Sequence, residues 1–316
     1  MSNQPPRRPL EPMYHRALGW YSREEIDSTR TKTVGVAGAG GDGHRYADLV
    51  RTFPLACIKA ADPDVVTEDG LGRFAIAGTG DVGRLKVDVF EDHVRGLPVE
   101  TEVEKYPEGI THENVESFVE GCDLIVEEVD LNHLDIAIDL HRTAQRMGKP
   151  VLTTMNVGFM GVGTSIKPGS RHSYETMLGI DPRTPFDEIA EMTISPDKLI
   201  PVLPWQYGDV RVLYALQDED AKVPFPSIDV GVDMAAGIGM TQAGLHLVKG
   251  LNNHRPEPVW APRWAYHDAM TNKAGVIRPS VARFWGSAAL LKLRSDFGLN
   301  PRTSYDVDTL REQGII

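Results

Sequence analysis

A glycine-rich turn between two short apolar segments limits most strongly what this chain can fold into. Residues 38–43 read Gly-Ala-Gly-Gly-Asp-Gly and directly follow the apolar residues 33–37. Residues 44–53 have the pattern of a helix, and residues 55–61 have that of a second strand, which ends at Asp62. Strand, glycine turn, helix and strand with an acid at its tip is the order of a nucleotide-binding α/β unit. The two strands are therefore expected to be parallel, with a right-handed connection.

Further apolar segments repeat this alternation as far as residue 157. Three more helices are predicted, over residues 82–93, 114–120 and 134–147. Three more strands are predicted, over residues 99–106, 122–129 and 151–155. The predicted fold class is α/β, a Rossmann-like and mostly parallel sheet flanked by helices, with a long excursion and a C-terminal extension. In such sheets ligands bind at the carboxyl ends of the strands.

The composition divides the chain into four parts. Residues 1–30 are expected to form an N-terminal arm and helix, and residues 31–157 the nucleotide-binding core. Residues 158–225 are rich in glycine, proline and turn residues, which predicts a crossover excursion from the sheet that contacts the substrate. Residues 226–316 are expected to hold a returning strand and helix, a late helix over 280–297, and the C-terminal extension.

The charge balance and the cysteines argue against several classes of protein. The 316-residue chain has 33 Lys and Arg against 45 Asp and Glu, a formal net charge of −12. Nucleic acids and anionic membranes bind clustered positive charge, so neither is an expected partner. Cys57 and Cys122 lie in or beside apolar runs and form no CxxC pair, which indicates buried thiols and no four-cysteine zinc site. No apolar run reaches the roughly 18 residues of a membrane span, and we expect a cytoplasmic protein.

A set of charged residues at fixed distances from the glycine turn points to a bound triphosphate. Asp62 can accept hydrogen bonds from ribose hydroxyls, and Arg73 and Lys86 can contact anions. Asp130, at the end of a predicted strand, offers the hard oxygen ligand that Mg²⁺ prefers. Each residue alone has an ordinary explanation as a solvated turn acid, an exposed cation or a helix N-cap, and the glycine turn alone is compatible with packing without a ligand. The prediction of a nucleotide site therefore depends on the whole set.

Six short motifs lie between residues 20 and 130, each occurring once. They are Trp20-Tyr21-Ser22-Arg23, Gly38-Ala39-Gly40-Gly41-Asp42-Gly43, Asp62-Pro63-Asp64, Gly70-Leu71-Gly72-Arg73, Asp81-Val82-Gly83-Arg84-Leu85-Lys86 and Glu127-Glu128-Val129-Asp130. With these motifs, the stretch from about residue 21 to residue 156 resembles the ThiF/MoeB-type adenylyltransferases, the bacterial relatives of ubiquitin-activating enzymes. The gaps between Asp62 and Lys86 match the family without insertion, so the resemblance is specific over roughly two-fifths of the chain.

This resemblance implies a role for each matching position. Asp62 would hold the ribose of ATP, Lys86 would stabilise charge on the α-phosphoryl group, and Arg73 would clamp the outer phosphates. Arg23 would reach the same phosphates from the other subunit of a homodimer, and Asp130 would bind Mg²⁺. The remaining candidate cofactor-binding residues are Gly38, Gly40, Gly41, Gly43 and Asp64.

The chain departs from the family pattern at several positions. Gly70 and Gly72 stand in the element where the family has asparagine, which removes polar contacts to the phosphates. Asp42 replaces an apolar residue of the glycine turn, and a carboxylate there repels phosphate unless it points away. No cysteine follows Cys122, so an enzyme thioester on the crossover segment would lack its nucleophile.

The expected function is ATP-dependent activation of a carboxylate, or an amide, of a small molecule or peptide as an acyl-adenylate. Pyrophosphate would be released, ATP and Mg²⁺ are the expected cofactors, and a homodimer is the expected assembly. Two alternatives stay open. A non-catalytic partner subunit of the same fold would explain the departures from the family pattern. An NAD(P)-dependent oxidoreductase would explain the glycine turn and the acid after the second strand, but not the two cations.

Overall fold

The computed structural model describes residues 9–130, 133–192, 227–252 and 254–280, together with scattered positions between 282 and 297. Its strands are β1 Thr33–Ala37, β2 Cys57–Ala61, β3 Glu102–Tyr106, β4 Leu124–Glu127, β5 Val151–Val157, β6 Met160–Ile166, β7 Trp264–Asp268 and β8 Lys273–Ile277. Its α-helices are α1 Arg23–Ser28, α2 Lys86–Arg95, α3 Val115–Val119, α4 Leu134–Arg146, α5 Tyr174–Leu178, α6 Phe186–Ala190 and α8 Asp229–Leu247. Short 3₁₀ helices are η1 Pro12–Ala17, η2 Thr29–Thr31, η3 Gly43–Arg51, η4 Asp69–Gly72 and η5 Thr79–Asp81. Residues 193–225 of the expected excursion, and most of the helix expected over 280–297, lie outside the described residues.

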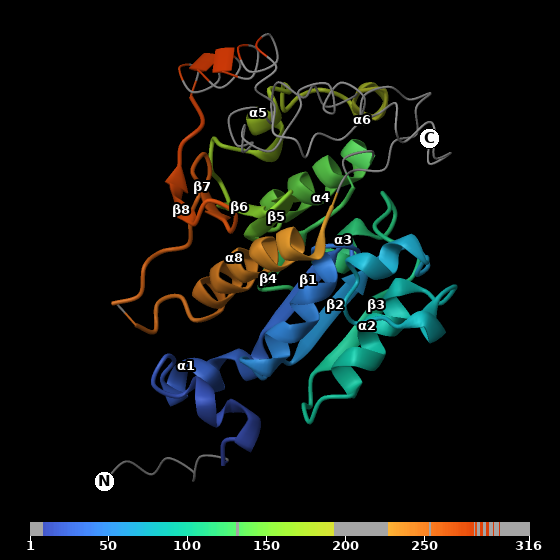
Figure 1. Cartoon of the computed structure of the whole chain (residues 1–316), viewed down its shortest axis with the longest axis vertical. Coiled ribbons are helices and arrows are strands. Elements are labelled where there is room, and N and C mark those ends of the chain that lie inside the picture. Colours follow the sequence, from blue (N-terminus) through green and yellow to red (C-terminus); the bar gives the residue numbers. More distant parts are fainter. Residues whose placement is uncertain are drawn as a thin grey trace.

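These strands form one mixed sheet in the order β3-β2-β1-β4-β5-β6-β7-β8 (Figure 1). The strands from β3 to β5 in this order are parallel, and β6, β7 and β8 extend the sheet with antiparallel neighbours. The chain runs from β1 outwards to β3 and then returns to β4 on the other side of β1. A topological switch point therefore lies between the carboxyl ends of β1 and β4, where α/β sheets bind ligands. The predicted fold class is confirmed.

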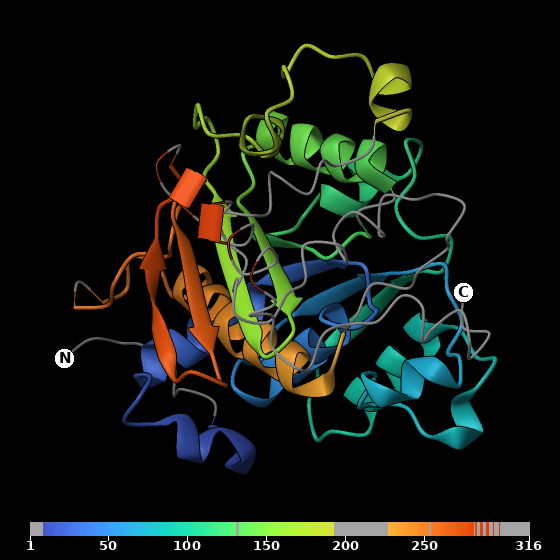
Figure 2. The same cartoon turned by 45° about the horizontal axis from the view of Figure 1, so that its top comes forward.

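Helices cover both faces of the parallel half of the sheet (Figure 1, Figure 2). On one face, η3, α2 and α8 pack over a core that includes Val34, Val36 and Ile58. On the other face, α3 and α4 pack over Ala37 and Ile125. Successive strand residues therefore alternate between two buried faces, which explains why β1 and β4 are apolar almost throughout.

The helix α8 lies close to the sheet because its inner face has small residues. Gly231, Ala235, Gly239 and Ala243 recur every four residues, which places them on one side of the helix, and all four are buried. A Cβ atom on Gly239 would lie 1.9 Å from the hydroxyl oxygen of Tyr46, which packs under the helix. Neither α8 nor any other helix in the described part of the chain has the length and apolar character needed to span a bilayer.

The strand β6 corrects the expectation that the chain leaves the sheet at residue 158. It folds back on β5 as a hairpin, with Val151 paired to Ile166 and Val157 to Met160. The glycines that suggested a loop are needed because α8 crosses the strand: a Cβ atom on Gly161 would lie 2.2 Å from the backbone nitrogen of Ala235. The excursion therefore begins after β6, and the returning strands β7 and β8 follow α8.

Two predicted helices differ from the observed ones. The segment predicted as a helix over 44–53 forms the 3₁₀ helix η3. The helix predicted over 82–93 starts only at Lys86, because Gly83 adopts a φ of 88° and closes a turn before the helix begins. Lys86 is consequently the first residue of α2, at the carboxyl edge of the sheet.

Gly239→Ala is expected to destabilise the protein by about 1–3 kcal/mol, because the added methyl group must displace Tyr46 from its 3.0 Å hydrogen bond with Thr154. Gly237→Ala is the matched control in the same helix, since its methyl group would meet no heavy atom within 4 Å. It is expected to stabilise the protein by up to about 1 kcal/mol through helix propensity. Urea denaturation measures both effects, and equal stabilities for the two variants would contradict the packing of α8 on Tyr46.

Candidate functional site

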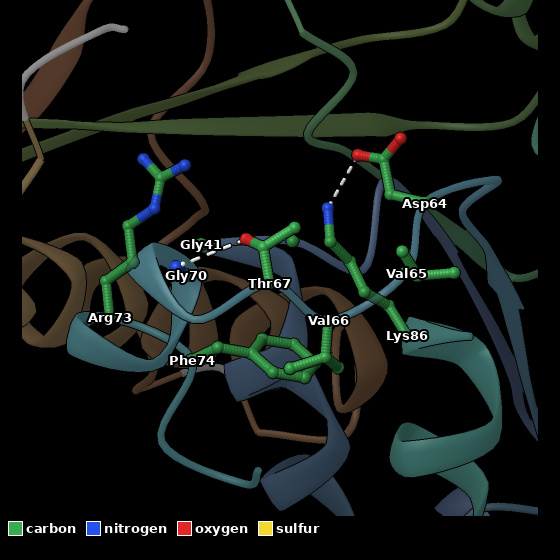
Figure 3. A pocket seen from close by; sticks show the side chains of 10 residues that line it. Gly41, Asp64, Val65, Val66, Thr67, Gly70, Arg73, Phe74 and Lys86 are labelled. Carbon is green, nitrogen blue, oxygen red and sulfur yellow. Dashed lines mark hydrogen bonds and ion pairs between the residues drawn. The ribbon is translucent and has the colours of Figure 1, made fainter. Parts of the chain in front are cut away.

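A cavity of about 310 Å³ opens at the carboxyl edge of the sheet, beside the glycine turn. It is lined by Gly40 and Gly41, by residues 64–67 after β2, by Gly70, Arg73 and Phe74, and by Lys86 (Figure 3). Four stretches of the chain thus meet around one hollow, beside the carboxyl ends of β1 and β2. The charged side chains that line it are Asp64, Arg73 and Lys86, and its other polar groups are the hydroxyl of Thr67 and the backbone.

The four glycines of the turn divide into two pairs. Gly38 has a φ of 91°, and a Cβ atom there would lie 2.2 Å from the carbonyl oxygen of Glu128. A Cβ atom on Gly43 would lie 1.8 Å from the carbonyl oxygen of Gly38, so both glycines are needed to close the turn against β4. Gly40 and Gly41 face the cavity instead, where an added Cβ atom would find only ordinary contacts at 3.5 Å or more. Their bare backbone allows a phosphate to approach closely.

Asp62, at the tip of β2, is buried and held rigidly. Its carboxylate accepts hydrogen bonds from the backbone N–H groups of Ala39 and Asp64, each at 2.9 Å, and lies 3.6 Å from Nζ of Lys86. Burial raises the pKa of Asp62, and the charge of Lys86 opposes that rise. Asp62 is therefore not a solvated turn acid. Its carboxylate joins the glycine turn to the segment after β2.

The two predicted cations, Lys86 and Arg73, both border the cavity, and Figure 3 shows their side chains rising on either side of Thr67. The ammonium group of Lys86 donates a 2.6 Å hydrogen bond to the exposed carboxylate of Asp64. Arg73 follows η4, and no ion pair joins it to a carboxylate among the residues that the structure describes. The guanidinium group is therefore available to an anion that enters from solvent.

Gly70, where the family pattern has asparagine, has a local reason for its missing side chain. A Cβ atom on Gly70 would lie 2.9 Å from the hydroxyl oxygen of Thr67. The backbone N–H of Gly70 donates a 3.3 Å hydrogen bond to that same oxygen. The Thr67 hydroxyl thus supplies a polar group on the wall where the asparagine side chain is absent.

Five predicted site residues do not line this cavity: Gly38, Gly43 and Asp62, which support the turn beside it, and Arg23 and Asp130, which lie elsewhere. Arg23 lies on α1, before the start of β1, and is paired with Asp27 at 2.5 Å. Asp130 is exposed and follows β4, at the carboxyl edge of the sheet. In the described part of the chain, no group of three or more His, Cys, Asp or Glu side chains is arranged to hold a metal ion by itself.

Asp42, the unexpected acid of the glycine turn, points away from the cavity. It accepts a 2.9 Å hydrogen bond from the backbone N–H of Asn156, at the end of β5, and two more from the side-chain amide at 2.9 and 3.0 Å. The hydroxyl of Ser227 in turn donates to the amide oxygen of Asn156 at 3.0 Å. Burial raises the pKa of Asp42 to about 6, against the lowering effect of these hydrogen bonds. The carboxylate is thus held beneath the turn, where it ties β5 and the start of α8 to the site.

A second acid lies beside Asp42 under the turn. The carboxyl group of Glu128 is hydrogen-bonded to the hydroxyl of Thr154, which is 3.0 Å from the hydroxyl of Tyr46. Burial, followed by the charge of Asp42, raises the pKa of Glu128 well above its usual range. The buried surroundings of Glu128 therefore disfavour a second negative charge beside Asp42.

Two residues that shape the site were not predicted from the sequence. Asn156 fixes Asp42, and its only signal is a polar residue at the end of an apolar strand. His44 is buried directly after the glycine turn and contacts both sides of the cavity. A histidine at that point in an otherwise ordinary turn-and-helix pattern was a signal that could have been used.

Comparison with known sequences identifies a family. A sequence model of the ThiF family matches residues 14–284. Among curated proteins, "Uncharacterized protein MT1398" of Mycobacterium tuberculosis (strain CDC 1551 / Oshkosh) is 30% identical over 159 residues, which cover 49% of this chain and 22% of that protein. "Adenylyltransferase and sulfurtransferase uba4" of Pyricularia oryzae is 32% identical over 101 residues, which cover 32% of this chain and 21% of that protein. Each match spans only about a fifth of the relative's length.

Solved structures share the fold at low sequence identity. The crystal structure of PaaA matches with a TM-score of 0.60 at 17% identity, over 81% of this chain and 75% of that chain. Escherichia coli MccB with succinimide matches with a TM-score of 0.62 at 16% identity, over 87% and 72% of the two chains. The structure of MccB with ATP matches with a TM-score of 0.59 at 16% identity, over 81% and 67%.

The buried Asp42 predicts a measurable dependence of stability on pH. Its pKa rises from an ordinary value of 3.8 to about 6 on folding, so between these pH values the folded protein binds the proton more tightly than the unfolded chain. The stability from this group is complete below about pH 4 and is lost as the pH rises through 6, by roughly 3 kcal/mol in all. The difference in unfolding free energy between wild type and Asp42→Asn should therefore fall by about that amount between pH 4 and pH 7.

The exposed Glu120→Gln variant is the control for this titration, and its difference from wild type should stay constant over the same range. Chemical denaturation at a series of pH values gives both curves. A flat curve for Asp42→Asn would show that Asp42 is solvated in the folded protein.

Proposed function

Because this chain belongs to the ThiF family, we propose that it is an ATP-dependent adenylyltransferase that activates a carboxylate, or an amide, as an adenylate. The main support is the convergence of Lys86 and Arg73 on one cavity beside the open backbone of Gly40 and Gly41. Two cations next to a glycine turn suit a polyphosphate, because backbone N–H groups and fixed positive charges both favour anions. The structure of MccB with ATP, which shares the fold, is consistent with this nucleotide.

ATP would lie with its ribose at Asp62 and its phosphates between the cations. The rigid carboxylate of Asp62 is suited to accept a hydrogen bond from a ribose hydroxyl. The ammonium group of Lys86 lies between Asp62 and the glycine turn. It would give up its hydrogen bond to Asp64 and donate one to the α-phosphoryl group instead. Arg73, on the opposite wall, would contact the outer phosphates (Figure 3).

Asp130 would complete the site by binding Mg²⁺. A single exposed carboxylate at the carboxyl edge of the sheet fits this ion, which proteins commonly bind through one or two carboxylates while nucleotide phosphates and water supply the rest. The ion would neutralise charge on the phosphates. Arg23 would act in the same site only if supplied by a second copy of the chain in a homodimer, because in its own subunit it precedes β1 at the other end of the strand.

The chemistry needs positioning and charge stabilisation more than proton transfer. A substrate carboxylate is ionised at neutral pH, so its oxygen can attack the α-phosphorus without a general base. The new P–O bond forms while the bond from the α-phosphorus to the pyrophosphate oxygen breaks, and the electron pair leaves with pyrophosphate. Lys86 and Arg73 would stabilise the charge that develops on the α-phosphoryl group and on the leaving group.

The acceptor is proposed to be a small molecule or peptide with a carboxylate or amide. Structures of MccB, which shares this fold, include one in complex with N-formylated MccA. An enzyme thioester is not part of the proposal, because Cys57 and Cys122 are the two cysteines of the chain. Burial raises the pKa of Cys122 to about 12 and also raises that of Cys57, so neither thiol is prepared to act as a nucleophile at neutral pH.

Lys86→Ala is expected to lower the rate of ATP–pyrophosphate exchange by about a hundredfold or more, the usual effect of removing a preorganised cation. The assay would contain a pool of free amino acids and short peptides with free C-termini as acceptors. Arg84→Ala is the matched control, because Arg84 is paired with Asp81 and Asp92 outside the cavity, and it should leave exchange unchanged. Unchanged exchange in the Lys86 variant would remove that residue from the reaction.

Calorimetry separates the proposed function from its alternatives. ATP with Mg²⁺ should bind the wild-type protein, and a reduced nicotinamide cofactor should not. Binding of ATP without exchange for any acceptor in the pool would favour the non-catalytic partner subunit, which Gly70 and Gly72 also favour. Binding of the nicotinamide cofactor alone would favour the oxidoreductase, whose support is the glycine turn and Asp62.

A further inference from the structure

His44 is a fully buried histidine that touches both walls of the cavity. Its Nδ1 lies 3.0 Å from the carbonyl oxygen of Gly40, in the glycine turn. Its Nε2 lies 3.2 Å from the backbone nitrogen of Ala75, two residues beyond Arg73. The ring also packs edge-on against Phe74, with ring centroids 4.8 Å apart. One imidazole therefore connects the glycine wall to the arginine wall.

The two partners fix the tautomer of this imidazole. The N–H group of Ala75 can only donate, so Nε2 must accept with its lone pair. The carbonyl of Gly40 can only accept, so Nδ1 must hold the proton and donate it. The ring is consequently neutral, and burial lowers the pKa of His44 to about 4, which keeps it neutral at physiological pH. A charged ring would place a second N–H against the N–H of Ala75.

We propose that His44 is a positioning residue that sets the distance between the glycine turn and the segment bearing Arg73, and so aligns the guanidinium group with the phosphates of the nucleotide. This inference rests on the proposed function. His44 touches no substrate itself and acts through the backbone of Gly40 and Ala75.

Arg73 depends on such a support because little else holds its segment. It follows the four-residue 3₁₀ helix η4, and its own N–H bonds only to the carbonyl of Gly70 within the same segment. Short 3₁₀ turns are weakly held, and loops of this kind open at low free-energy cost. Packing of Phe74 on Val66 and Val89 anchors the apolar side of the segment, whereas the His44 hydrogen bond fixes its backbone relative to the glycine turn.

Two substitutions separate the two hydrogen bonds of the ring. The side-chain oxygen of glutamine reaches the position of Nε2, so His44→Gln can still accept from Ala75. Asparagine is shorter and reaches only the position of Nδ1, so His44→Asn keeps the contact with Gly40 and loses the bridge. Thermal denaturation of both variants establishes that each is folded. If His44 only fills space, the loss of thermal stability in each variant should follow the volume of the new side chain. ATP binding through Arg73 should then be affected no differently in the two variants.

Hydrogen exchange tests the bridge without any nucleotide. In the ligand-free wild-type protein, the amide of Ala75 should be protected, although its side chain is exposed. His44→Asn should exchange this amide about fivefold faster or more, the factor that corresponds to one lost hydrogen bond, and His44→Gln should exchange it at nearly the wild-type rate. Equal exchange of the Ala75 amide in wild type and His44→Asn would overturn the bridge.

Calorimetry with ATP and Mg²⁺ tests the role toward the nucleotide. His44→Asn should weaken binding about tenfold, His44→Gln should restore most of it, and Arg73→Ala should weaken binding at least as much as His44→Asn. The double variant His44→Asn, Arg73→Ala should bind no more weakly than Arg73→Ala alone, because the histidine acts through the arginine. Additive losses, or undiminished ATP binding by a His44→Asn variant whose Ala75 amide has lost its protection, would overturn the positioning role.

The two measurements keep this inference separate from the proposed function. A wild-type protein that binds no ATP would overturn the proposed function and, with it, the role of His44 toward a nucleotide. The exchange rate of the Ala75 amide would still decide whether the imidazole bridges the two walls.

Discussion

Close contact between the glycine turn and the end of β4 is the constraint from which the site is built. Gly38 lies against the carbonyl of Glu128, and no side chain fits between them. Held there, the turn directs the amide of Ala39 to Asp62 and leaves the backbone of Gly40 and Gly41 open to the cavity. The two cations lie on other segments: Lys86 begins α2, and Arg73 follows η4. Charges positioned in this way are ready for a ligand before it binds, which is what electrostatic stabilisation of a reaction requires.

The sequence predicts the parallel half of the sheet and the gathering of charges at its edge for a simple reason. Strands buried on both faces read as continuous apolar runs, and the residues that follow them must meet at one edge. The antiparallel strand β6 escaped prediction because Gly161 and Gly163 serve contacts with α8, which is distant in the chain. The direction of Asp42 also depends on a distant partner, Asn156. The residues that flank these positions in the sequence give no sign of either contact, because both partners are distant in the chain.

The acids beneath the turn explain how a site for anions tolerates carboxyl groups so near. Burial and the neighbouring Asp42 raise the pKa of Glu128 and so disfavour its charged form. Asp42 keeps its charge against donors from Asn156, on the side away from the cavity. The network also connects the turn through Ser227 to the start of α8. The side of the turn that borders the cavity and the side that faces β5 and α8 are therefore joined by polar contacts that are satisfied within the protein.

The position of Lys86 at the start of α2 has a further consequence for the stability of variants at this residue. As the first residue of α2, its ammonium group sits where the aligned peptide dipoles present partial positive charge, an arrangement that weakens a helix. Asp64 and Asp88 offset part of this repulsion. Lys86 is thus unfavourable for the helix that it begins, which is typical of residues that serve binding or catalysis and not folding. Neutral replacements at this position would relieve the unfavourable interaction with the dipole and leave the fold intact, so any loss of activity in such a variant would arise in the cavity and not from unfolding.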